Sequence, residues 1–128
     1  MPERMLPSPT VTPENKTFWD SASQGKFMIK RCGGCKRPHY YPRTMCPHCG
    51  SMETHWEESS GRGEIYALSI MRTAEIPYSV GYVTLDEGVQ VLTNFVDADM
   101  NTLRIGQPVK VTFRQSDGDV MVPLFCPS

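Results

Sequence analysis

The strongest constraint on this chain is a pair of Cys-x2-Cys motifs, Cys32/Cys35 and Cys46/Cys49, which ten residues separate. Each motif folds into a knuckle that turns two sulfurs toward one point, and the connecting loop brings the two pairs together. Four thiolates in this arrangement predict a tetrahedral metal site. Zinc is the expected metal, with a rubredoxin-like iron centre as the alternative, and four unligated buried thiols as the weaker interpretation.

The predicted metal is structural, because four thiolates fill the coordination sphere and leave no position for water or substrate. His39 and His48 lie near the motifs and are interpreted as solvated loop histidines. A fifth cysteine, Cys126, makes the total odd, which argues against a disulfide framework. No Ser-His-Asp or Cys-His pattern is evident, so the sequence predicts no catalytic residue.

The composition of the chain excludes several classes of protein. The chain has 128 residues, a formal net charge of −1, 10 Gly and 11 Pro, which describes a turn-rich globular protein. A nucleic-acid-binding protein is expected to carry net positive charge, and the near-neutral charge of this chain does not show it. The sequence has no apolar run near the roughly 20 residues that cross a bilayer, and its start does not look like a secretory signal. We expect a soluble, cytoplasmic protein without a membrane partner.

The order of helix, cysteine and strand patterns along the sequence divides the chain into four predicted segments. Residues 1–11 are expected to be a flexible leader, and residues 12–25 a helix with Thr12 as N-cap and Gly25 as its C-terminal breaker. Phe18 and Trp19 on this helix either pack on their own domain or contribute to a partner surface. Residues 26–58 form the predicted zinc ribbon.

Residues 59–128 change to the two-residue period of strands. Five strands with a short helical turn between the third and fourth predict an OB-type barrel, and a generic five-stranded sheet is the alternative. The fold class is therefore mainly β: an N-terminal helix, a rubredoxin-like zinc ribbon, and a five-stranded OB-fold barrel. Val91 and Leu92 are among the candidate core residues. The expected strands are 63–71, 80–85, 88–96, 109–113 and 120–125, with the helical turn at 99–103.

Charge is polarised along the chain. The stretch from Lys26 to Arg43 has six basic residues and no acidic one, whereas acids prevail after Thr84. Part of this basic charge offsets a tetrathiolate–zinc centre of about −2, and the remainder is expected to attract an anion such as phosphate. Tyr40 and Tyr41 lie within the basic stretch and either pack in the core or stack on a base.

The order of the parts resembles one family. The motifs that carry the resemblance are Lys30-Arg31-Cys32-x2-Cys35, Tyr41-Pro42-Arg43-x2-Cys46-Pro-x-Cys49-Gly50-Ser51, Ser60-Gly61-x-Gly63-x-Ile65-Tyr66, Val83-x-Leu85-Asp86-Glu87-Gly88 and Ile105-Gly106-x-Pro108-Val109. Over about residues 13–126 the chain looks like the zinc-ribbon plus OB-fold proteins known as domain of unknown function 35.

This resemblance implies an accessory role in lipid or aromatic acyl-CoA metabolism. Family members form complexes with thiolase-like or ketosynthase-like enzymes, or with hydratases and aldolases, and the partner supplies the catalytic residues. We therefore expect a non-catalytic subunit of a hetero-oligomer with one structural zinc per chain and coenzyme A or acyl-CoA as ligand. The cations placed to meet the CoA phosphates are Arg31, Arg37, Arg43 and Arg62.

Two other functions remain open at this stage. OB barrels and zinc ribbons also bind single-stranded nucleic acid, although Tyr82 and Phe95 are the only aromatic residues on the second and third expected strands. The chain could instead be an acyl transferase with Cys126 as nucleophile. No base or cation is evident beside that thiol, which favours an inert cysteine.

Overall fold

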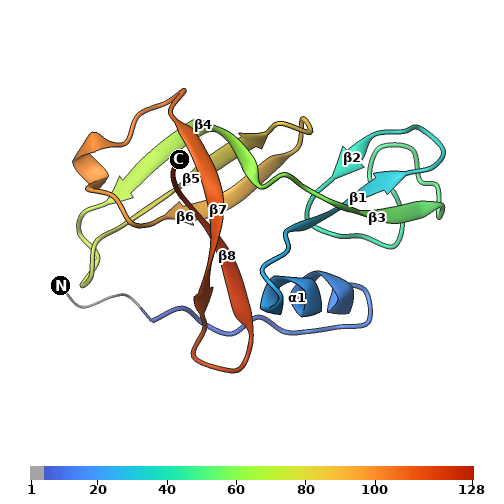
Figure 1. Cartoon of the computed structure of the whole chain (residues 1–128), viewed down its shortest axis with the longest axis horizontal. Coiled ribbons are helices and arrows are strands. Elements are labelled where there is room, and N and C mark those ends of the chain that lie inside the picture. The colour runs from blue at the N-terminus through green and yellow to red at the C-terminus, as the bar shows by residue number, and fades with distance from the viewer. Residues whose placement is uncertain (1–4) are drawn as a thin grey trace.

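The structure is a computed structural model that describes residues 5–128. A small three-stranded sheet and a closed five-stranded barrel stand side by side, and helix α1 (Lys16–Ser23) lies at the junction between them (Figure 1). The predicted fold class is confirmed: the chain is mainly β, with an N-terminal helix, a zinc-ribbon region and an OB-type barrel.

Helix α1 (Lys16–Ser23) is shorter than predicted at its start. Thr12 is not the N-cap. Instead, the Asn15 side-chain oxygen accepts the Thr12 backbone N–H at 2.7 Å and closes a turn before the helix. The predicted end is correct: Gly25 has φ +78, and the N–H of Lys26 donates to Ser21 in the pattern of a Schellman cap.

The ribbon sheet has the order β2-β1-β3. Its strands are β1 (Met28–Cys32), β2 (Pro38–His39) and β3 (Thr54–Glu58), and both pairings are antiparallel. The first cysteine knuckle begins at the last residue of β1 and continues into the β1–β2 loop, and the second lies between β2 and β3. Because β2 has only two residues, hydrogen bonds of the sheet fix little of the long segment between β2 and β3.

The barrel closes in the order β4-β5-β6-β8-β7, with β7 returning to pair with β4. The parallel β6–β8 pairing rests on one residue pair, Phe95 with Phe125. Gly88 lies in the turn before the third strand, where its φ of +91 is incompatible with an extended strand, so that strand starts later than predicted. The barrel elements are β4 (Arg62–Met71), β5 (Tyr78–Leu85), β6 (Gln90–Phe95), η1 (Met100–Thr102), β7 (Pro108–Gln115) and β8 (Met121–Pro127).

Strand alternation and one bulge decide which side chains of β4 face outward. Alternation buries Ile65 and turns Tyr66 into solvent, and the register against β5 then shifts so that Ala67 pairs with Tyr82. Leu92 is also exposed, which corrects its assignment to the core, because alternation along β6 turns Val91 inward and Leu92 outward. A Cβ at Gly81 would collide with the Ala67 carbonyl oxygen, so glycine is required there.

An aromatic cluster joins the helix, the ribbon and the barrel. Phe18 makes edge-on contacts with Trp19 and Phe27, and Phe27 packs edge-on against Phe125 of the barrel. The Trp19 indole N–H donates to the Tyr41 hydroxyl at 2.7 Å. Phe18 and Trp19 are therefore buried inside the chain, which favours the first of the two alternatives, packing on their own domain, over a partner surface. The apolar face of α1 packs on its own domain.

The beginning of the described chain runs along the β7–β8 hairpin (Figure 1). Residues 5–11 have no regular secondary structure, but the Leu6 carbonyl accepts the Asp117 N–H and the Ser8 N–H donates to the Asp117 carboxylate, both at 2.8 Å. This part of the predicted flexible leader is thus anchored to the barrel. Residues 1–4 lie outside the described residues.

Candidate metal centre and the ribbon–barrel cleft

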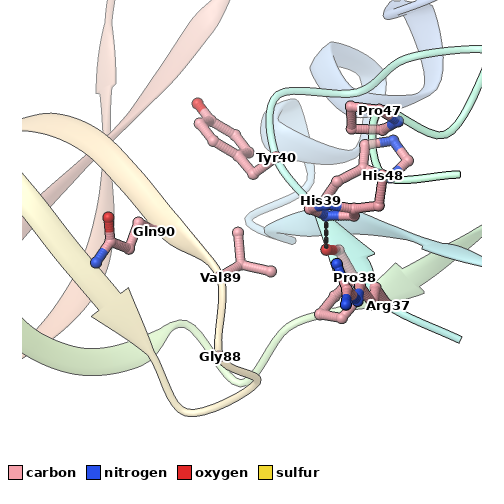
Figure 2. A pocket seen from close by; sticks show the side chains of 9 residues that line it. All are labelled: Arg37, Pro38, His39, Tyr40, Pro47, His48, Gly88, Val89 and Gln90. Carbon is pink, nitrogen blue, oxygen red and sulfur yellow. Dashed lines mark hydrogen bonds between the residues drawn. The ribbon is translucent and has the colours of Figure 1, made fainter.

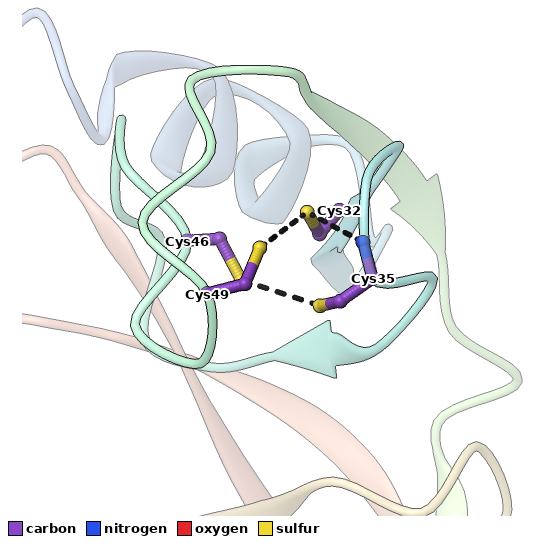
Figure 3. A group of neighbouring side chains, drawn as sticks. All are labelled: Cys32, Cys35, Cys46 and Cys49. Carbon is purple, nitrogen blue, oxygen red and sulfur yellow. Dashed lines mark hydrogen bonds between the residues drawn. The ribbon is translucent and has the colours of Figure 1, made fainter.

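The four predicted ligands converge on one point (Figure 3). Their sulfur atoms all lie within 4.8 Å of one another, with 3.6 Å between Cys32 and Cys49 and 3.7 Å between Cys35 and Cys46. Tetrahedral zinc with Zn–S bonds of about 2.3 Å requires sulfurs about 3.8 Å apart. The donor set and its spacing therefore fit a single tetrahedral Zn²⁺ ion.

The backbone prepares these sulfurs for a cation. The N–H groups of Gly34 and Cys35 point at the Cys32 sulfur at 3.2 and 3.4 Å, and the His48 N–H points at Cys46 at 3.4 Å. The N–H of Cys35 is the main reason that the pKa of Cys32 is lowered to about 6. Such N–H groups stabilise the thiolate form, which is the form that binds metal.

Cys49 shows why the cluster needs positive charge. The Ser51 N–H favours its thiolate, yet the neighbouring sulfurs of Cys32, Cys35 and Cys46 raise its pKa to about 11. Several thiolates within a few ångströms repel one another unless a cation lies between them. A divalent metal held by the four cysteines would remove this repulsion and favour the thiolate form of each ligand, so the crowding of the sulfurs and their spacing fit the same occupant.

A lysine and a histidine support the ligand-bearing strands. Lys30 on β1 is buried, and its Nζ contacts the Arg43 carbonyl, the Thr54 hydroxyl at 3.2 Å, and the face of the Trp56 ring at 4.8 Å. His39 on β2 is only 3% exposed, which corrects its interpretation as a solvated loop residue. Its Nε2 accepts the Arg43 N–H, and burial lowers its pKa, so the ring is neutral.

The four predicted phosphate-binding arginines fall into two groups. Arg31 forms a two-pronged ion pair with Glu57 at 2.9 and 3.0 Å, and Arg43 stacks over the Tyr41 ring at 5.7 Å. Arg37 and Arg62 are exposed, and neither guanidinium has an ion-pair partner within residues 5–128. Only the second group is available to an anion without breaking a contact.

Arg37 lines a cleft of about 330 Å³ between the ribbon and the β5–β6 turn (Figure 2). On the ribbon side, the second knuckle contributes His48, whose Nε2 lies 3.3 Å from the Pro38 carbonyl. On the barrel side, Gly88, Val89 and Gln90 form the wall. The cleft thus lies between the second cysteine knuckle and the barrel, and Arg37, which has no ion-pair partner among the described residues, lines it.

The connection between ribbon and barrel depends on a carboxylate that the sequence did not reveal. Glu87 in the β5–β6 turn accepts the Ser59 hydroxyl and the Ser60 N–H, both at 2.8 Å. The Ser59 hydroxyl in turn accepts the Gly61 N–H at 3.0 Å. The Asp86-Glu87-Gly88 motif indicated a hairpin turn, but only the fold brings it beside residues 59–61, so spacing alone gave no signal.

The remaining cysteine lies in the barrel, away from the four-cysteine cluster of the ribbon. Cys126 is buried on β8, where its backbone pairs with Lys110 of β7.

Tyr40 and Tyr41 pack in the aromatic cluster, so they are not free to stack on a base. No helix of the described residues is long and apolar enough to span a bilayer.

A zinc ribbon that a short linker connects to an OB barrel, with the N-terminal helix packed against both, is a two-part architecture that the family models also recognise. Residues 19–54 match the rubredoxin-like zinc ribbon domain of ChsH2, and residues 56–114 match the C-terminal OB-fold domain of ChsH2. A DUF35 domain-containing scaffold protein of Methanocaldococcus jannaschii is 31% identical, with 70% of each chain covered. The chain belongs to the DUF35 family.

Two further relatives cover nearly the whole chain. A probable enoyl-CoA hydratase alpha subunit of Thermomonospora curvata is 31% identical over 99% of this chain, which spans 41% of that subunit's length. A solved structure described as the Ltp2-ChsH2(DUF35) aldolase superposes with a TM-score of 0.80 at 31% identity, covering 94% of this chain and 98% of the other.

Proposed function

We propose that the chain is a non-catalytic, acyl-CoA-binding accessory subunit of an acyl-CoA enzyme in the cytoplasm. The partner is of the hydratase/aldolase type or of the thiolase/ketosynthase type, and it supplies the catalytic residues. The observation that carries this proposal is the likeness to the DUF35 chain of the Ltp2-ChsH2 aldolase, which extends over both the ribbon and the barrel.

The chemistry of the metal centre supports an accessory role. When bound, a four-thiolate zinc supplies a fixed point for the knuckle loops and no open position for substrate. Cys32 and Cys46 are buried, and the N–H groups around them hold the thiolates in place. The chain's own residues therefore build a rigid presenting surface, and the reacting groups are expected on the other subunit.

The available arginines indicate where the coenzyme would be held. Arg37 at the ribbon–barrel cleft and Arg62 at the start of β4 are unpaired among the described residues, and the planar guanidinium suits phosphate. Arg31 and Arg43 contribute positive potential while remaining engaged with Glu57 and Tyr41. We infer that the CoA phosphates lie at this junction.

Affinity purification of the tagged chain from its native host tests the proposal. The expected result is a subunit of an identified acyl-CoA enzyme in fixed stoichiometry, and acyl-CoA turnover only in the joint complex. Arg37→Gln together with Arg62→Gln should weaken CoA binding by about tenfold or more, while Arg72→Gln leaves it unchanged. Turnover by the isolated chain, or no acyl-CoA enzyme in the complex, would contradict the proposal.

One observation keeps single-stranded nucleic acid as a second candidate. Tyr66 and Tyr82 are 59% and 43% exposed on neighbouring strands, next to Leu92, so two aromatic rings do share the outer face of the barrel. Phe95, in contrast, is buried, which corrects the aromatic pair considered from the sequence. Salt-dependent binding of single-stranded DNA that is lost in Tyr82→Ala would favour this function.

A further inference from the structure

A second, larger cavity lies at the far end of the barrel from the β5–β6 turn. Its volume is about 770 Å³, which is within the range of about 300–1,000 Å³ typical of small-molecule sites. Four segments far apart in sequence form its walls: the start of the described chain, the β4–β5 loop, the end of β6 with the residues after it, and the β7–β8 hairpin.

The lining is mainly hydrocarbon. The chain start and β8 provide aliphatic side chains, the β4–β5 loop provides an isoleucine and a proline, and the β6 end provides an aromatic ring. Methionine in the lining adds a flexible surface that adapts to ligands of different shape. The apolar residues that matter most for the argument are Leu6, Ile76, Phe95, Ala98, Met100 and Leu124.

The polar groups in the walls are engaged with the protein. Arg114 and Asp97 form an ion pair, so the two charged residues of the lining neutralise each other. The Asn94 amide donates to the Ser79 carbonyl at 2.9 Å, and the Gln115 amide donates to the Gly118 carbonyl at 2.6 Å. Among the described residues the cavity offers a phosphate no free cation, whereas an uncharged hydrocarbon breaks none of these contacts by entering.

We propose that this cavity binds the hydrocarbon part of an acyl group, either a fatty chain or a fused-ring skeleton. The inference rests on the proposed acyl-CoA-binding function and adds a separate site to it. The phosphates are assigned to the arginines at the ribbon–barrel junction, and the acyl group to the neutral cavity at the opposite ends of β5 and β6.

Calorimetric titration of the full metal-loaded chain with decanoyl-CoA, CoA and decanoate tests this assignment. Decanoyl-CoA should bind about tenfold or more tightly than CoA, because burial of each methylene adds to affinity. Ala98→Trp fills the cavity and should bring decanoyl-CoA to within about twofold of CoA. The matched substitution Ala74→Trp lies outside the lining and should preserve the difference.

A second variant guards against misfolding of Ala98→Trp. Ile76→Gln changes a loop residue of the lining without filling the barrel, and it should weaken decanoyl-CoA while leaving CoA unchanged. Equal affinities for decanoyl-CoA and CoA, or equal effects of the two tryptophan variants, would overturn the assignment. Decanoate binding that Ala98→Trp removes, without binding of either CoA compound, would retain the cavity and contradict only the acyl-CoA function.

Discussion

The zinc ribbon and the barrel reach a fixed shape by different means. The barrel buries a continuous apolar interior built from alternating strand residues such as Ile65, Val83 and Val91. In the ribbon, the two-residue strand β2 fixes little of the segment between β2 and β3. Two of the four candidate metal ligands, Cys32 at the end of β1 and Cys46 in that segment, are buried. The comparison leads us to expect that the barrel depends on its apolar core, and the ribbon on the metal that its four cysteines are placed to bind.

Removing the metal should have the largest effect and should separate the two halves. Chelation, or Cys46→Ser, leaves several thiols crowded together without a cation, and we expect the ribbon over residues 26–58 to lose its structure. Hydrogen exchange would then show loss of amide protection in β1–β3 and retained protection in β4–β8. Equal loss in both halves would mean that the barrel cannot stand without the ribbon.

A cavity in the barrel should produce the opposite pattern. Ile65→Ala removes a fully buried side chain and should lower the free energy of unfolding by about 2–5 kcal/mol, as measured by urea denaturation. Metal content should not change. Tyr66→Ala, one residue further along β4, removes an exposed ring and is the matched control, with an expected change below about 1 kcal/mol.

The junction between the halves has its own test. Glu87→Ala removes the carboxylate that accepts the Ser59 hydroxyl and the Ser60 N–H, at an expected cost of about 1–2 kcal/mol. It should also increase hydrogen exchange in the linker at residues 59–61. Glu75→Ala in the β4–β5 loop is the control, and identical behaviour of the two variants would show that Glu87 does not couple the halves.

The smallest effect is expected from the Arg31–Glu57 ion pair within the ribbon. Arg31 lowers the pKa of Glu57 below its ordinary value of 4.5, so the pair stabilises the fold above that pH and loses its contribution as the pH falls. Both side chains are about a third exposed, so Glu57→Gln should cost at most about 1 kcal/mol at neutral pH. The matched control is Glu58→Gln. In acid unfolding curves, its stability should differ from that of the parent chain less, as a function of pH, than the stability of Glu57→Gln does.

The parts that sequence could predict are those that local pattern determines. Cysteine spacing predicted that the four sulfurs converge, Gly25 predicted the helix end, and the two-residue period predicted the barrel strands. The shift of the helix start from Thr12 to Lys16 came from a side chain that competes for the backbone, because Asn15 closes a turn just before the helix.

The parts that sequence missed depend on contacts between distant segments. His39 is buried because the ribbon folds over it, and the larger cavity exists because Leu6 is held against Asp117 at the far end of the chain. The bulge in β4 between Ile65 and Ala67 likewise follows from pairing with β5. No local pattern encodes these arrangements.

The central claim is that the ribbon depends on a metal bound by its four cysteines. Elemental analysis of the purified chain, before any chelator is added, tests this claim most directly. One zinc atom per chain, released together with loss of ribbon protection, is the predicted result. A well-folded chain that contains no stoichiometric metal, with β1–β3 still protected from exchange, would contradict it.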